Sequence, residues 1–191
     1  MVPYVIEKSD KGDKVYDLYS KLLSDRIVFI RGEFNPAMAD AVTAQLLFLE
    51  SQDNEKDIYL YINSPGGMVT SMFSIFDTMQ YIKPDICTIA YGDAASAASF
   101  ILSAGTKGKR FALPNASVML HELSGGHQGK FHELLNSFKH TEKLYEKMAK
   151  YYVEFTGQKL EKIQEDMKID YYMSAKEAKE YGVIDDIYSG R

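Results

Sequence analysis

Short apolar segments alternate with segments of helical spacing along most of this chain. The apolar segments lie near residues 26, 58, 86, 109 and 117, and several are rich in β-branched side chains. Runs of this kind are typical of buried strands, and helical stretches lie between most of them. The alternation predicts an α/β fold in which strand ends gather on one side, where such folds place their sites.

Helical spacing of apolar residues is clearest in the middle and at the end of the chain. The predicted helices cover residues 16–23, 38–49, 68–82, 131–155, 160–167 and 175–181. The longest, 131–155, would reach about 40 Å at about 1.5 Å per residue, more than a compact domain of this length needs. We therefore expect it to project, and its exposed apolar residues predict contact with a partner subunit. Ser174 and Glu177 have the form of a capping box for the last helix.

Composition excludes several classes of protein. The 191 residues carry a formal net charge of −5 and 46% hydrophobic residues, which fits one globular domain over residues 1–191. Basic residues are interspersed, so we expect no nucleic-acid partner and no membrane contact. The single cysteine, Cys87, lies in an apolar segment and offers neither a disulfide nor a metal cluster. With no apolar run near the roughly 18 residues of a membrane span, and early charges in place of a signal sequence, we expect a cytoplasmic protein.

Two predicted strands end in turns built from small residues, and each turn precedes a helix. One turn is Asn63-Ser64-Pro65-Gly66-Gly67, whose glycines allow positive φ and the close approach of a ligand. The other follows the strand at residues 86–91, where we place a turn at Gly92 and Ser96 in the first turn of the next helix. A serine at a helix start is commonly a cap, but it can also be a nucleophile. Position alone leaves both interpretations open.

One of the four histidines differs from the others in its setting. His121 follows the apolar strand 117–120, so its side chain is expected at a strand end that faces a crevice. His132 and His140 lie among charged residues of the long helix and fit a solvated face, whereas His127, in a glycine-rich stretch, is undecided. On its own, His121 is compatible with a structural role and with that of a base.

A serine hydroxyl becomes a nucleophile when a base takes its proton and a carboxylate orients that base. Ser96 and His121 are candidates for the first two members. Asp170, which lies beside an apolar tripeptide and before a helix, is the candidate carboxylate. Spacing alone does not separate it from the other acids of this region, Asp166, Asp185 and Asp186.

Acyl transfer at a serine also needs two converging donors for the oxyanion. The backbone N–H of Gly67, at the end of the glycine turn, is one candidate. The N–H of Ala97, the residue after the serine, is the other. With the three side chains above, these positions outline a serine-hydrolase site without deciding it.

Several longer stretches carry a resemblance to a known family. They are residues 45–50 (QLLFLE), 57–67 (DIYLYINSPGG), 77–85 (DTMQYIKPD), 92–96 (GDAAS), 108–111 (GKRF) and 173–175 (MSA). Together they resemble the proteolytic subunit of the Clp protease, the ClpP family of serine peptidases. The resemblance runs from Val2 to the region of Ile187, essentially the whole chain.

This resemblance implies a fold and a set of site residues. The fold is a ββα superhelix of the crotonase type with a projecting handle helix, the handle region covering residues 122–156. The implied nucleophile, base and orienting carboxylate are Ser96, His121 and Asp170. The implied oxyanion donors are Gly67 and Ala97. The residues implied to hold an extended peptide by main-chain hydrogen bonds are Met68, Ser124, Gly125 and Gly126.

The resemblance also implies partners. Members assemble as seven-membered rings stacked in pairs, a tetradecamer that encloses the active sites. An ATP-driven unfoldase of the AAA+ class, such as ClpX, ClpA or ClpC, threads unfolded protein substrates into it for protein quality control. ATP binds that partner, so no cofactor is implied, and this chain has no Walker A pattern. Residues 1–14 would form a mobile segment lining the axial pore. The implied unfoldase-docking residues are Tyr59, Tyr61, Tyr81, Phe111 and Tyr188.

The chain departs from the family pattern near the implied site. The departures are Asp93 for a common Gln, Ala97-Ala98 for Met-Gly, Glu122-Leu123 for Gln-Pro, and Ile169 for an arginine that joins the two rings in relatives. They keep open the alternative of a paralogous subunit, inactive alone and active only in a mixed ring with a second relative. A crotonase-type acyl-CoA enzyme is a further alternative, but it would share the fold without needing Ser96, His121 and Asp170 together.

Overall fold

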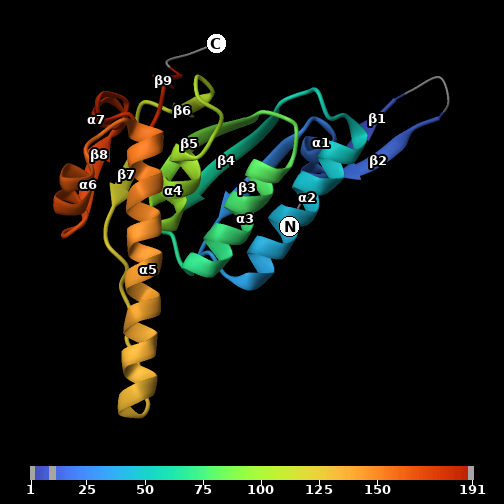
Figure 1. Ribbon diagram of the computed structural model, residues 1–191. Helices are drawn as coiled ribbons and strands as arrows, with labels where there is room; N and C mark the ends of the chain where they lie inside the picture. The colour runs from blue at the N-terminus through green and yellow to red at the C-terminus, as the bar shows by residue number, and fades with distance from the viewer. Residues whose placement is uncertain (1–2, 9–11, 189–191) are drawn as a thin grey trace.

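Nine strands and seven helices form the part of the chain that the computed structural model describes, residues 3–8 and 12–188 (Figure 1). The strands are β1 (Tyr4–Glu7), β2 (Lys14–Asp17), β3 (Ile27–Arg31), β4 (Ile58–Ser64), β5 (Ile86–Ala95), β6 (Arg110–Ala112), β7 (Ser117–Leu120), β8 (Tyr171–Ser174) and β9 (Asp186–Ile187). The helices are α1 (Leu18–Ser24), α2 (Pro36–Gln52), α3 (Val69–Tyr81), α4 (Ala97–Ser103), α5 (Phe131–Thr156), α6 (Leu160–Asp166) and α7 (Ala175–Tyr181). The predicted α/β class is confirmed.

Seven of the strands form one mostly parallel sheet. β3, β4, β5, β6 and β9 are hydrogen-bonded in that order and run parallel. β7 pairs parallel with the end of β5 and antiparallel with β8. In β4, Ile58, Leu60 and Ile62 are buried while Tyr59 and Tyr61 alternate with them on the other face, as the sequence predicted. β5 is buried on both faces over residues 86–90, which explains its unbroken apolar run.

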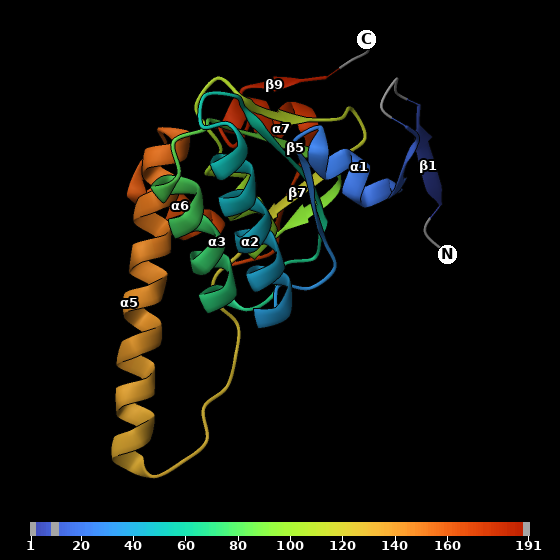
Figure 2. The same cartoon turned by 90° about the vertical axis from the view of Figure 1, so that its right-hand side faces the viewer.

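Helices α2 and α3 lie side by side and cover one face of the sheet (Figures 1 and 2). α2 begins where the Asn35 side chain accepts a hydrogen bond from the Met38 N–H at 2.9 Å, with Pro36 in the first helical position. The core between these layers includes Phe34, Leu46 and Phe100, all fully buried. The layers hold the ends of β4 and β5 in fixed positions for the turns that follow them.

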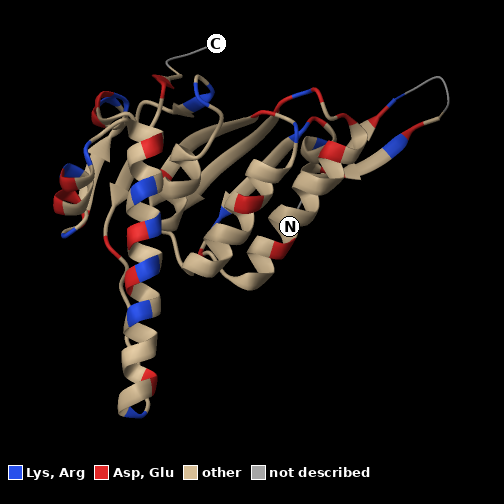
Figure 3. Cartoon of the chain, in the orientation of Figure 1, with Lys and Arg blue, Asp and Glu red and all other residues tan. Residues whose placement is uncertain are grey.

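Helix α5 projects from the body, as its predicted length indicated. Its buried residues, Met148, Ala149 and Tyr152, all lie toward its C-terminal end, where aromatic rings join it to α3 and α4. At its other end Phe131 and Phe138 are 69% and 60% exposed. Figure 2 shows this half extending away from the sheet, with the preceding loop running beside it. In Figure 3, acidic and basic residues are interspersed along the same helix.

The structure corrects the prediction of a turn at Gly92. β5 continues to Ala95, because residues 93–95 pair with β7 and the Asp93 N–H donates to Asn63 Oδ1 at 3.1 Å. A Cβ at Gly92 would lie 2.6 Å from that Asn63 oxygen. Gly92 therefore makes room for a side chain from β4 and does not turn the chain.

The N-terminal region contains two short strands, and the helix predicted over 16–23 begins later than expected. Of residues 1–14, numbers 1, 2 and 9–11 lie outside the described residues, but β1 and β2 pair antiparallel, with Tyr4 opposite Asp17. Residues 16 and 17 thus belong to a strand, and α1 begins only at Leu18, where Asp17 caps it by accepting from the Ser20 N–H. Within the described part of the chain, none of the helices combines the length and apolarity that crossing a bilayer requires.

Candidate active site

Ser96 occupies a sharp turn between β5 and α4. Its backbone has φ 57° and ψ −120°, and it is one of two described residues other than glycine with positive φ, Arg26 being the second. The Ser96 N–H donates to Met119 O at 2.8 Å, but its side chain makes no capping bond. The interpretation as a helix cap is therefore wrong. A strained serine at a strand-to-helix turn exposes its hydroxyl, and such strain persists where the surroundings enforce it.

The register of three strands brings a histidine and an aspartate to that hydroxyl. Because β7 pairs with β5, with Met119 beside Ala95, the residue after β7 lies next to the Ser96 turn. Because β7 pairs with β8, with Leu120 opposite Tyr171, the residue after β7 also faces the residue before β8. Those two residues are His121 and Asp170. His121 Nε2 lies 2.8 Å from Ser96 Oγ, and His121 Nδ1 lies 3.0 Å from Asp170 Oδ1.

The other three candidate aspartates contact other partners. Asp166 accepts from the Tyr181 hydroxyl and pairs with Lys162. Asp185 pairs with the buried Arg110, and Asp186 with Lys179. Of the four acids that spacing left open, the structure places only Asp170 against His121. A row of this kind can pass a proton from a serine to an imidazole whose tautomer the carboxylate fixes.

The glycine turn after β4 packs directly on the serine turn. A Cβ at Gly66, where φ is 97°, would lie 2.6 Å from the Ser96 Cβ and 3.1 Å from the Ala97 N. The buried Ser64 hydroxyl fixes this turn, since it donates to Gly32 O at 2.5 Å and accepts from the Gly66 N–H at 3.1 Å. Sequence reasoning did not select Ser64; its place in the same turn, two residues before the glycine pair, was the signal available.

Gly67 lies against the loop after β3. The Phe34 N–H donates to Gly66 O and the Met68 N–H to Phe34 O, both at 2.8 Å, so the Gly67 N–H faces away from Phe34. The Ala97 N–H, at the first position of α4, has no intrahelical partner. The two predicted donors thus belong to adjoining turns. Gly67 also lines a cavity of about 240 Å³, together with Glu33, Pro65, Gly66, Ser96, His121 and Ser124.

Comparison with known families identifies the family of the chain. The sequence model of the Clp protease family matches residues 10–191. The chain belongs to the Clp protease family. Membership makes it a ClpP-type protease, in a family of generally serine-type peptidases, and implies oligomeric assembly and association with Clp ATPases. The predicted resemblance is confirmed, and the α/β body with its projecting α5 is consistent with the ClpP fold.

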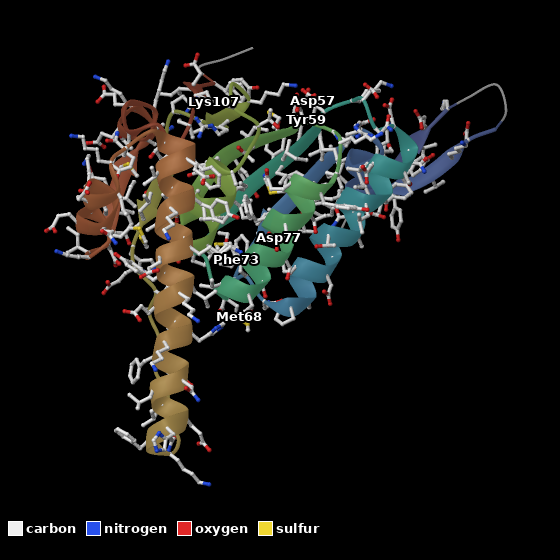
Figure 4. All side chains as sticks on the ribbon, in the orientation of Figure 1. Asp57, Tyr59, Met68, Phe73, Asp77 and Lys107 are labelled. Atoms are coloured by element: carbon white, nitrogen blue, oxygen red, sulfur yellow. The ribbon has the colours of Figure 1, made fainter. Side chains whose placement is uncertain are left out.

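In this Clp protease chain the predicted peptide-binding residues flank the cavity. Met68 is 47% exposed at the start of α3, where Figure 4 shows it at the lower end of that helix. Ser124, Gly125 and Gly126 form an exposed, extended strip before α5. His127, which the sequence left undecided, fastens the strip to α5 through a 2.9 Å contact between its Nε2 and the Thr141 hydroxyl.

A second cavity, of about 310 Å³, lies between the strip and α5. Its lining residues are Val69, Leu123, Ser124, Gly125, Gly126, His127, Phe138, Thr141 and Leu144. The two cavities share Ser124, so one extended chain could contact both. Among the described residues, no group of three or more His, Cys, Asp or Glu side chains is placed to share a metal ion.

The predicted docking residues lie away from the serine, and the structure brings only some of them together. Phe111 and Tyr188 stack with ring centroids 4.1 Å apart. Burial and the adjacent Cys87 raise the pKa of Tyr188 to about 12, with smaller contributions from Tyr59 and Tyr61. Tyr81 is 80% exposed at the end of α3. Figure 4 shows Tyr59 at the end of its strand opposite to the end that Met68 adjoins.

Cys87 is a core residue, as predicted. It is 3% exposed, and burial raises the pKa of its thiol to about 11. A thiol with a raised pKa is a poor nucleophile. Ser96 is therefore the better candidate nucleophile.

Proposed function

We propose that the chain is the serine endopeptidase subunit of a self-compartmentalised, ATP-dependent protease that hydrolyses unfolded proteins to short peptides. One observation carries the proposal: Ser96, His121 and Asp170 form a hydrogen-bonded row, at 2.8 and 3.0 Å, on a strained strand-to-helix turn. A serine used only for capping would need neither a histidine partner nor this backbone conformation.

The order of Ser96, His121 and Asp170 in this row determines how a peptide bond would be cleaved. His121 Nε2 takes the proton of the Ser96 hydroxyl as its oxygen attacks the peptide carbonyl, and Asp170 holds the Nδ1–H and stabilises the imidazolium. The N–H groups of Gly67 and Ala97 receive the oxyanion. His121 then gives the proton to the leaving amine. Water, activated by the same base, releases the acyl group from Ser96.

Substrate binding would use the backbone more than side chains. Met68 and the strip Ser124–Gly126 offer main-chain donors and acceptors to an extended peptide, and glycines keep this backbone accessible. Binding through the main chain suits a protease of broad substrate range. A requirement for extended substrate also suits a partner that delivers unfolded chain.

Assembly and partners form the second part of the proposal. Heptameric rings stacked in pairs as a tetradecamer would use the exposed apolar residues of α5, including Phe131, Leu135 and Phe138. An AAA+ unfoldase such as ClpX, ClpA or ClpC would dock on the aromatic set that includes Phe111 and Tyr188. ATP would serve that partner, the subunit itself needing no cofactor, and the setting would be cytoplasmic protein quality control.

A second candidate is the paralogous subunit that acts only in a mixed ring. The Asp170 side chain is 59% exposed, and the adjacent Ile169 is 66% exposed. A neighbouring subunit could therefore cover this end of the row and hold the carboxylate in place.

Hydrolysis of a fluorogenic peptide by the purified homo-oligomer separates the two candidates. We expect cleavage by the chain alone, lost in Ser96→Ala, and degradation of a folded, tagged protein only with an unfoldase and ATP. An oligomer that cleaves nothing until a second family member is added would favour the mixed ring. Cleavage that survives in Ser96→Ala would refute both candidates.

A further inference from the structure

A tyrosine of the projecting helix α5 is linked by hydrogen bonds to the turn that carries Ser96. Tyr152 on α5 is 1% exposed, and its hydroxyl lies 2.9 Å from Ser99 Oγ on α4. Ser99, also fully buried, donates from that same Oγ to the carbonyl oxygen of Ser96 at 2.7 Å. The two hydroxyls connect residues 53 positions apart in the sequence.

The two hydroxyls form a hydrogen-bond chain, and its direction follows from counting protons. Ser99 has one hydroxyl proton, and the Ser96 carbonyl can only accept, so that proton is on the bond to Ser96 O. Tyr152 must then be the donor to Ser99 Oγ. Burial raises the pKa of the Tyr152 phenol, which keeps its proton in place. The chain therefore runs from Tyr152 through Ser99 to Ser96 O, with each donor oriented toward the active-site turn.

The chain ends on the peptide group that carries the proposed oxyanion donor. The Ser96 carbonyl and the Ala97 N–H belong to one planar trans peptide, so they point in opposite directions. A bond that fixes the carbonyl on the α4 side also fixes the N–H on the opposite side. The Phe100 N–H donates to the same carbonyl oxygen at 3.2 Å, and the two bonds together hold ψ of Ser96 at the unusual value of −120°. Hydrogen bonds to a carbonyl also polarise the attached N–H, and successive bonds in a chain reinforce one another.

A local role for Ser99 alone would not need the tyrosine. Serine side chains in helices often donate to a carbonyl three or four residues back, and Ser103 does so to Ser99 O at 2.7 Å. That second bond touches neither Ser96 nor Tyr152. A phenol buried in an aromatic cluster, with ring neighbours such as Phe100 at 5.5 Å, is costly unless its hydroxyl is paired. Its only hydrogen-bond partner among the described residues is Ser99.

We propose that Ser99 and Tyr152 are positioning residues, which orient and polarise the Ser96–Ala97 peptide so that its N–H stabilises the oxyanion. The inference rests on the proposed function, since it assigns these residues a part in the same reaction. It also connects α5 to the chemistry through two hydroxyls, those of Tyr152 and Ser99.

The test compares the removal of hydroxyls that belong to this hydrogen-bond chain with the removal of neighbouring hydroxyls that do not. Ser99→Ala and Tyr152→Phe break it, while Ser103→Ala and Tyr151→Phe remove neighbouring hydroxyls from the same two helices. Tyr151 packs on Phe76 with centroids 4.8 Å apart, and its hydroxyl has no hydrogen-bond partner among the described residues. For each protein, kcat and KM for a peptide, the inhibition constant of a peptide boronate and the thermal midpoint are measured.

We expect kcat to fall about tenfold in Ser99→Ala and about threefold in Tyr152→Phe, with KM within about twofold, because an oxyanion donor acts mainly in the transition state. Boronate inhibition, which forms a tetrahedral adduct, should weaken by similar factors. The double variant should be no slower than Ser99→Ala and more stable than it, since Phe removes the hydroxyl that Ser99→Ala leaves buried and unpaired. Both off-chain variants should keep the wild-type kcat.

Each remaining outcome counts against a specific statement. An active wild type whose kcat survives Ser99→Ala and Tyr152→Phe overturns the inference alone, even if both variants lose stability. Equal losses of kcat in Ser103→Ala or Tyr151→Phe would do the same, because they would show a general packing effect. A folded wild type that does not cleave peptide overturns the proposed function and the inference with it.

Discussion

Replacing Gly66 with alanine tests whether the glycine turn sets the position of Ser96. A new Cβ would lie 2.6 Å from the Ser96 Cβ and 2.7 Å from the Ala95 carbonyl oxygen. Ordinary contacts begin near 3.4 Å, and neither neighbour is the far end of a flexible side chain. One of the two turns must therefore shift by several tenths of an ångström.

Two contributions set the loss of stability in Gly66→Ala. Alanine at a positive φ is strained by about 1–2 kcal/mol. The overlap adds about 1–3 kcal/mol, as overpacking in a tight interior does. For a chain of this length the thermal midpoint should fall by about 5–15 °C. A displacement of the nucleophile that approaches 1 Å should slow acylation by about 100-fold.

Gly108→Ala is the matched control. Gly108 has a similar φ of 87°, but nothing lies within 4 Å of a Cβ built there. It should lose only the backbone term, about 1–2 kcal/mol, and acylate at a rate within about twofold of wild type. Thermal unfolding and a mass-spectrometric time course of fluorophosphonate labelling measure both quantities. If folded Gly66→Ala labels as fast as Gly108→Ala, the steric argument is wrong.

Three further variants address stability and docking. Burial raises the pKa of Asp185, but the hydrogen bonds and the charge of Arg110 outweigh burial and hold this pKa below its ordinary value of 3.8. The pair of Asp185 and Arg110 should therefore stabilise the fold above about pH 4, and this contribution should be lost as the pH falls. Asp185→Asn should then cost about 3 kcal/mol in denaturant unfolding at pH 7 and flatten the acid limb; an unchanged acid limb would contradict this. Ser174→Ala removes a capping box and should lower the free energy of unfolding by about 1 kcal/mol in the same assay. An unchanged free energy of unfolding would show that the cap does not stabilise the fold. Phe111→Ala opens the stack on Tyr188 and should reduce unfoldase-dependent degradation several-fold while peptide cleavage persists; equal loss of both would argue against docking there.

Local features of the fold could be predicted from the sequence. The helix predicted over 131–155 is α5, because apolar residues at helical spacing report one packed face directly. The capping box at Ser174 and Glu177 forms as predicted, since both partners lie within one turn. The strands predicted near residues 58 and 86 are the central pair β4 and β5.

Features that depend on residues distant in the sequence could not be predicted in this way. β5 runs past Gly92 because Asn63 and β7 hold it, and neither is near it in the sequence. Asp170 was one of four candidate acids until the pairing of β7 with β8 placed it beside His121. The contact of Tyr152 with Ser99 had no sequence signal, because an apolar helix face accounts for a tyrosine equally well.

Reaction of the purified protein with a fluorophosphonate, followed by intact mass, tests the central claim most directly. The account predicts one adduct per subunit, absent in Ser96→Ala and much slower in a folded His121→Ala, because Ser96 needs its base to react. A protein that is folded and oligomeric but forms no adduct would contradict an aligned row in the homo-oligomer. An adduct that persists in Ser96→Ala would place the nucleophile elsewhere.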